Sequence, residues 1–195
     1  AGIAAAASSS SSGSSSPSPE PDDTPLSAID AETVESNNSG EVVIDVKQAD
    51  AGLYTVNTPN ADKLTFTGTS GTGVDTLDIT IRDIAGAGTE GTRDLTLDTS
   101  ELVGVERLRF SFDQAEDTVK VSADSDLLGF SVIEVAKGDA DLREVEIDRG
   151  VEFEVNSGVT LTLDQFQSAA SLSSVTGLGR LTIVTENQAE LDELE

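Results

Sequence analysis

The sequence predicts an all-β protein, built as a β-solenoid-like stack of short strands. Apolar and polar residues alternate from residue 76 to residue 155, as in Leu77-Asp78-Ile79-Thr80-Ile81, and this period of two is typical of a half-buried strand. The strand centres from residue 95 onward lie 11 to 14 residues apart. Two strands would therefore form a coil of about 24 residues, within the range of repeat arrays. No Asn-Gly or Asp-Gly pair, the strongest hairpin signal, stands at a strand junction. A β-sandwich uses the same binary pattern and is the alternative fold.

Three segments are expected in chain order. Residues 1–25 are rich in Ser and Pro, which predicts a flexible arm or linker that buries little surface. Residues 26–186 form the β-rich structural domain, which opens on a short helical turn within residues 26–36. Residues 187–195 are an acidic C-terminal tail, with a short helical cap on the last coil as the alternative.

The alternation of apolar and polar residues places the strands within the domain. They are expected at residues 42–46, 53–56, 64–66, 77–81, 95–97, 108–112, 119–121, 133–135, 145–147, 151–155, 159–163 and 181–183. Gly-rich segments at 68–73 and 84–91 are expected to be turns. The first of these is not a phosphate loop, because no Lys and no helix follow it.

The charge balance restricts the partners. The chain has 37 acidic and 11 basic residues and a formal net charge of −26, which predicts repulsion from nucleic acid and from anionic membranes. No run of about 18 apolar residues is present, so we expect no membrane insertion. The chain begins with Ala, which we interpret as the result of signal-peptide removal. An extracellular or cell-surface location is expected from this.

The residue types argue against catalysis. Cys, His, Met and Trp are absent and Tyr54 is the single tyrosine, so the commonest general base is missing. An enzyme that cleaves polysaccharides would need two carboxylates at a defined separation and usually an aromatic-lined cleft. Carboxylates occur throughout this sequence and aromatic residues are few, so we expect no enzyme and no organic cofactor.

Two groups of residues are candidates for a site. Asp124 with Asp126, and Asp139 with Asp141, are alternate carboxylates placed at turns after strands. They are candidate Ca²⁺ ligands, because a hard cation takes several oxygen ligands; ordinary acidic turns are the alternative. Arg107 and Arg109 share the outer face of one strand. They are expected either to pair with Glu and Asp on neighbouring strands or to form an interface with a second subunit.

Three motifs carry a resemblance to a known family. Gly158-Val159-Thr160-Leu161-Thr162-Leu163, Gly177-Leu178-Gly179-Arg180-Leu181-Thr182-Ile183 and Gly104-Val105-Glu106-Arg107-Leu108 resemble strand units of bacterial secreted β-solenoid proteins of the surface-layer and large-adhesin type. The resemblance covers about residues 74–184. It implies a self-assembling or cell-surface role, with calcium often a structural ion, although the Gly- and Asp-rich calcium repeats of one subtype are missing.

These observations together predict a secreted structural subunit. We expect it to assemble with copies of itself into a surface layer or an extracellular filament, with Ca²⁺ as a candidate stabilising ion. The alternative is a monomeric cell-surface adhesin or binding module on a Ser-rich stalk.

Overall fold

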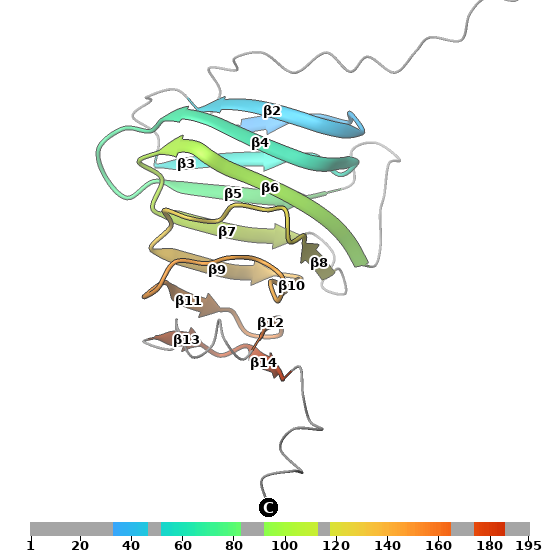
Figure 1. Ribbon diagram of the computed structural model, residues 1–195, viewed down its shortest axis with the longest axis vertical. Coiled ribbons are helices and arrows are strands. Elements are labelled where there is room, and N and C mark those ends of the chain that lie inside the picture. The colour runs from blue at the N-terminus through green and yellow to red at the C-terminus, as the bar shows by residue number, and fades with distance from the viewer. Residues whose placement is uncertain (1–32, 47–51, 83–91, 113–117, 165–173, 186–195) are drawn as a thin grey trace, which may run out of the picture.

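The strands of this protein form a β-solenoid of about six turns, confirming the predicted fold class. The computed structural model describes residues 33–46, 52–82, 92–112, 118–164 and 174–185, which form strands and turns with no helix. Figure 1 shows the strands piled along the long axis of the molecule, from the blue N-terminal coil to the red C-terminal coil.

Two seven-stranded parallel sheets make up the stack. One sheet has the order β1-β3-β5-β7-β9-β11-β13 and the other has the order β14-β12-β10-β8-β6-β4-β2. The strand bounds are β1 (Thr33–Glu35), β2 (Gly40–Val46), β3 (Leu53–Asn57), β4 (Ala61–Thr69), β5 (Thr76–Ile81), β6 (Thr92–Val103), β7 (Arg107–Phe112), β8 (Thr118–Val121), β9 (Val132–Lys137), β10 (Asp139–Asp141), β11 (Glu152–Val155), β12 (Thr160–Asp164), β13 (Val175–Gly177) and β14 (Arg180–Val184).

Each coil contributes one strand to each sheet and stacks in register on the coil before it. In the sheet of odd-numbered strands this register builds a buried column of Val34, Val56, Ile79, Phe110, Val135 and Val155. Buried side chains from both sheets belong to one hydrophobic core. The alternating residues point outward, so the period of two in the sequence becomes one apolar and one polar face.

The parallel pairing excludes the β-sandwich alternative. Every strand pairing among the described residues is parallel, whereas a sandwich of hairpins would pair its strands in antiparallel fashion. Partner residues in adjacent coils are separated by 20 residues between Val132 and Glu152 and by 33 residues between Leu64 and Leu97. The predicted coil of about 24 residues is therefore a good mean, but the coil length varies.

Two local predictions were wrong. The strand expected at residues 145–147 is a turn with one isolated bridge at Glu146, and the strand of that coil is β10 at Asp139–Asp141. β10 presents only Ala140 to the core, where it continues the column of Val119 and Leu161, so its apolar signal is weak. The helical turn expected within residues 26–36 is replaced at Thr33–Glu35 by β1, while residues 26–32 lie outside the described residues.

Two glycines are required by close contact between coils. Gly68 has φ +103°, and a Cβ there would lie 2.0 Å from the carbonyl oxygen of Val46. Gly177 has φ +105°, and a Cβ there would lie 2.0 Å from the carbonyl oxygen of Val155. Both glycines lie directly beside these residues in the adjacent strand, so any side chain would push two coils apart.

We therefore expect Gly68→Ala to destabilise the protein more than Gly150→Ala. Gly150 also has a positive φ of +85°, but a Cβ there meets nothing within 4 Å, so its substitution should cost only the backbone strain of about 1–2 kcal/mol. Gly68→Ala adds the clash with Val46 to a similar strain. Urea unfolding of the two variants measures the difference, and equal losses in the free energy of unfolding would contradict this contact.

Candidate functional site

A row of charged side chains crosses the outer face of the sheet of odd-numbered strands. In register across β5, β7, β9 and β11 lie Asp78, Arg109, Glu134 and Glu154. Neighbouring side chains in such a row are close enough to interact, and opposite charges stabilise the pairing. We call these four residues together with Arg107 the charge ladder.

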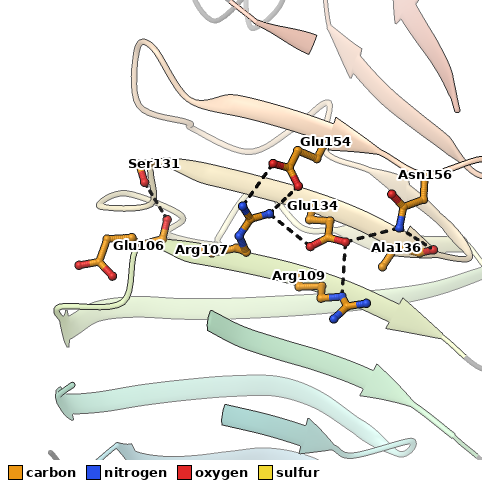
Figure 2. A network of polar contacts seen from close by, with 8 residues as sticks. All are labelled: Glu106, Arg107, Arg109, Ser131, Glu134, Ala136, Glu154 and Asn156. Atoms are coloured by element: carbon orange, nitrogen blue, oxygen red, sulfur yellow. Dashed lines mark hydrogen bonds and ion pairs between the residues drawn. The ribbon is translucent and has the colours of Figure 1, made fainter. Parts of the chain in front are cut away.

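Arg107 is the best-bound member of the charge ladder (Figure 2). Its Nη1 lies 2.6 Å from Oε2 of Glu154, and its Nη2 lies 3.2 Å from Oε1 of the same carboxylate. Nη1 also donates to Oε2 of Glu134 at 3.3 Å. A guanidinium that holds one carboxylate with two parallel hydrogen bonds is among the stronger ion pairs. It joins the outer face of β7 to β9 and to β11, two coils away.

Glu134 lies between the two arginines. Its Oε1 is 3.6 Å from Nε of Arg109 and accepts a hydrogen bond of 3.4 Å from the side-chain amide of Asn156 (Figure 2). The predicted site residues Arg107 and Arg109 are thus brought together with acidic partners from adjacent coils, which is the first of the two expected arrangements. An additional role of these arginines in an interface stays a prediction.

Asp78 ends the charge ladder in an unusual environment. Its side chain is only 8% exposed, and Oδ1 has no hydrogen-bond partner within the described residues. Burial raises the pKa of Asp78 above its ordinary value, and the nearby charge of Arg109 only partly opposes this effect. At Glu154 the hydrogen bonds from Arg107 dominate and lower the pKa. The same row therefore holds one carboxylate that favours its charged form and one that resists it.

The other sheet carries a second set of ion pairs. Nζ of Lys63 lies 3.1 Å from Glu41 and 3.7 Å from Asp98, and Nζ of Lys120 lies 2.9 Å from Glu144. Arg93 lies beside the inward residue Val119 in the register of β6 and β8, and its guanidinium donates to the carbonyl of Ala61. Burial lowers the pKa of Arg93.

The four candidate calcium ligands are not brought together. Asp124 is exposed in the turn after β8, and Asp126 accepts a hydrogen bond of 2.9 Å from the backbone N–H of Leu128. Contrary to the sequence-based expectation, Asp139 and Asp141 lie within β10 rather than in a turn. Oδ1 of Asp139 accepts from the N–H of Thr160 at 2.6 Å, and Oδ2 of Asp141 lies 2.6 Å from Nη2 of Arg143.

The described residues contain no group of three or more acidic side chains arranged to hold a metal ion. Asp126 has Asp98 and Glu146 as its neighbours in the stack, whereas Asp139 and Asp141 lie beside Thr118 and Lys120. Calcium binding therefore stays a prediction for Asp124, Asp126, Asp139 and Asp141. A bound Ca²⁺ would need oxygen ligands from more than one of these positions.

A groove of about 450 Å³ lies at the corner of the last three coils, those of β10, β12 and β14. It is lined by Asp139, Gly158, Val159, Thr160, Leu178, Gly179 and Arg180. Leu178 is 86% exposed, and the guanidinium of Arg180 makes no ion pair with any residue that the structure describes. These residues were not predicted to form a site from the sequence. The available signal was the absence of acidic residues from the last coil of a very acidic chain.

Comparison with protein-family models, with curated proteins and with solved structures gave no match for this chain. Among the residues that the structure describes, no helix is long and apolar enough to cross a membrane.

We expect Glu154→Gln to reduce stability at neutral pH. The folded-state pKa of Glu154 is below its ordinary value of 4.5, so pairing with Arg107 contributes stability above that pH and loses it as the pH falls through the folded-state pKa. The substitution should lower the free energy of unfolding at neutral pH by about 1 kcal/mol and have little effect in acid. Urea unfolding across this pH range is the measurement.

Asp78→Asn is the matched substitution with the opposite expected sign. Because the folded-state pKa of Asp78 is above 3.8, the folded protein binds the proton more tightly, and stability falls as the pH rises through that window. The neutral amide of Asn removes the cost of burying a charged carboxylate, so the substitution should increase the free energy of unfolding at neutral pH. This increase should vanish below the unfolded-state pKa of Asp78. A loss of stability at neutral pH would show that attraction to Arg109 outweighs burial.

Proposed function

We propose that this protein is a secreted structural subunit that assembles with copies of itself into an extracellular filament or surface layer. The supporting observation is that the stack has an unpaired strand edge at both ends. Within the described residues, β1 and β2 pair only toward the interior of the stack, and so do β13 and β14. An edge strand presents free N–H and C=O groups to which another chain can add.

Stacked coils also provide the stiffness that a scaffold needs. The strands of each coil pair only with those of the neighbouring coils, so the stability of the array is approximately a sum of coil and interface terms. Inter-coil links such as Arg107 with Glu154 tie coils that are not adjacent in sequence. A second subunit placed on an open end would extend the same pattern of pairing.

The net charge of −26 opposes this assembly. Like charges at this density repel between copies, and repulsion between exposed charges is screened beyond about 10 Å at 0.1 M salt. The proposed subunit therefore assembles in a saline or calcium-containing medium, which fits an extracellular location. Ca²⁺ is the proposed stabilising ion because it binds carboxylate oxygens.

A monomeric binding module at the cell surface is the second candidate. The observation that favours it is the groove with Asp139, Arg180 and the exposed Leu178, which offers both charges and an apolar side chain to a small ligand. The two proposals differ in the oligomeric state of the isolated protein.

Assembly should increase with protein concentration and with salt. We expect electron microscopy and sedimentation velocity to show filaments or sheets in about 1 M NaCl, where the Debye length is about 3 Å, and smaller species at low salt. A strictly monomeric particle under all conditions, with and without calcium, would overturn the proposed function.

Calcium should promote assembly beyond its effect on ionic strength. CaCl₂ is compared with MgCl₂ at the same ionic strength, because Mg²⁺ keeps its waters and demands a stricter geometry. Assembly that follows Ca²⁺ and reverses on chelation supports bound calcium. Equal responses to the two salts would assign the effect to screening and remove calcium from the proposal.

A further inference from the structure

The two ends of the stack differ in charge. The described residues of the first coil, 33–46, include Glu35, Glu41 and Asp45 and no basic residue. The last coil, residues 174–185, contains Arg180 and no acidic residue. The described residues of the two terminal coils therefore carry opposite charges, and opposite charges favour the approach of two surfaces.

The last coil also leaves part of the apolar interior uncovered. One coil earlier, Leu161 and Leu163 are completely or almost completely buried. Their partners in β14 are Leu181, which is half-buried, and Ile183, which is 42% exposed. Figure 1 shows β13 and β14 as the red coil at the end of the stack. At the other end Val42 and Ile44 of β2 are only 1% and 4% exposed, so the uncovered apolar row lies at the last coil, and the first coil contributes its acidic side chains and its strand edges.

We propose that the last coil of one copy binds the first coil of a second copy, head to tail. This inference rests on the proposed function and specifies its contact. β2 of the second copy would lie parallel to β14, and β1 would lie parallel to β13, so that both sheets continue across the junction. The joint would place Glu35, Glu41 and Asp45 against the coil that lacks carboxylates.

Apolar and charged positions together select the register. Leu181 and Ile183 point inward, as do Val42, Ile44 and Val46, and a shift by one residue would turn every side chain to the opposite face. Two registers then give both inward residues of β14 an apolar partner: Leu181 lies beside Val42 and Ile183 beside Ile44, or Leu181 beside Ile44 and Ile183 beside Val46. We choose the first register because it brings Arg180 next to Glu41, whereas the second places Arg180 next to Val43.

This contact does not close on itself. The two surfaces are different, so each bound copy presents a new free end, and repetition along the stack axis gives an open filament. Arg180 has no ion-pair partner within the described residues of its own chain, whereas Glu41 already lies 3.1 Å from Lys63. The incoming Arg180 would extend that pair into a row of alternating charges.

Complementary charge reversals test the proposal in the full-length chain. Arg180→Glu alone and Glu41→Lys alone each place like charges at the junction, and each should raise the concentration needed for assembly by about tenfold. Arg149→Glu is the matched control, since it makes the same charge change as Arg180→Glu at an exposed turn between β10 and β11, which is not part of either terminal coil. It should assemble as the unmodified protein does.

An equimolar mixture of the two variants is the decisive sample. Every junction between unlike copies again joins one acidic and one basic side chain, so the mixture should assemble at nearly the original concentration. Thermal unfolding of each variant checks that the folded state is kept, and recovery in the mixture itself requires both variants to be folded. Sedimentation velocity and electron microscopy provide the readout.

The outcomes separate this contact from the function on which it rests. Absence of assembly by the unmodified protein overturns both. Assembly that tolerates Arg180→Glu, or a mixture that does not recover, overturns the head-to-tail contact alone. A discrete dimer that ignores Glu41→Lys would show that two last coils bind each other. If residues 186–195 of the same chain cover the last coil, Arg180→Glu would change thermal unfolding but not assembly.

Discussion

Parallel pairing between successive coils is the interaction on which the rest of this structure depends. No coil of about 20 to 33 residues could bury its apolar side chains alone, because it has only two short strands. Stacking converts the scattered apolar residues into continuous columns, such as the one that runs from Val34 to Val155. It also satisfies the backbone N–H and C=O groups of each strand from the coils on either side.

The outward side chains must then tolerate being stacked at the strand spacing of about 4.8 Å. On a chain of net charge −26, stacking in register would often place two carboxylates in neighbouring strands side by side, where they repel each other. The few basic residues are placed where they interrupt such columns: Arg109 lies between Asp78 and Glu134, and Lys120 lies between Asp94 and Asp141. Arg107 compensates the adjacent acidic pair Glu134 and Glu154 by binding both, whereas the acidic column of Asp98, Asp126 and Glu146 has no basic residue between its members. The charge ladder is thus primarily a structural solution to repulsion.

The need of each coil for a neighbouring coil also determines the properties of the two ends of the stack. In the part of the chain that the structure describes, an inner coil has a neighbouring coil on each side and a terminal coil has one. Whatever covers the last coil must match an incompletely buried apolar row and the charge of Arg180. The first coil of a second copy has the strand direction, the apolar spacing and the acidic side chains for this. The proposed filament is therefore an extension of the internal pairing rather than a new kind of contact.

The sequence by itself determined the secondary structure class, the two strands per coil and most inward residues, because a period of two directly records which side of a strand is buried. It did not locate β10, since three residues with one inward Ala leave almost no pattern. It also did not indicate the inward position of Arg93, which follows from the pairing of Arg93 with Val119. It selected Arg107 and Arg109 but left open what they contact. Only the tertiary structure decided this, because the partners Glu134 and Glu154 lie 27 and 47 residues from Arg107 and become neighbours through the register of whole coils. The exposed apolar end, and an Arg180 without an ion-pair partner among the described residues, depend likewise on which coil is last in the stack. This is a property of the assembled array and not of any local segment.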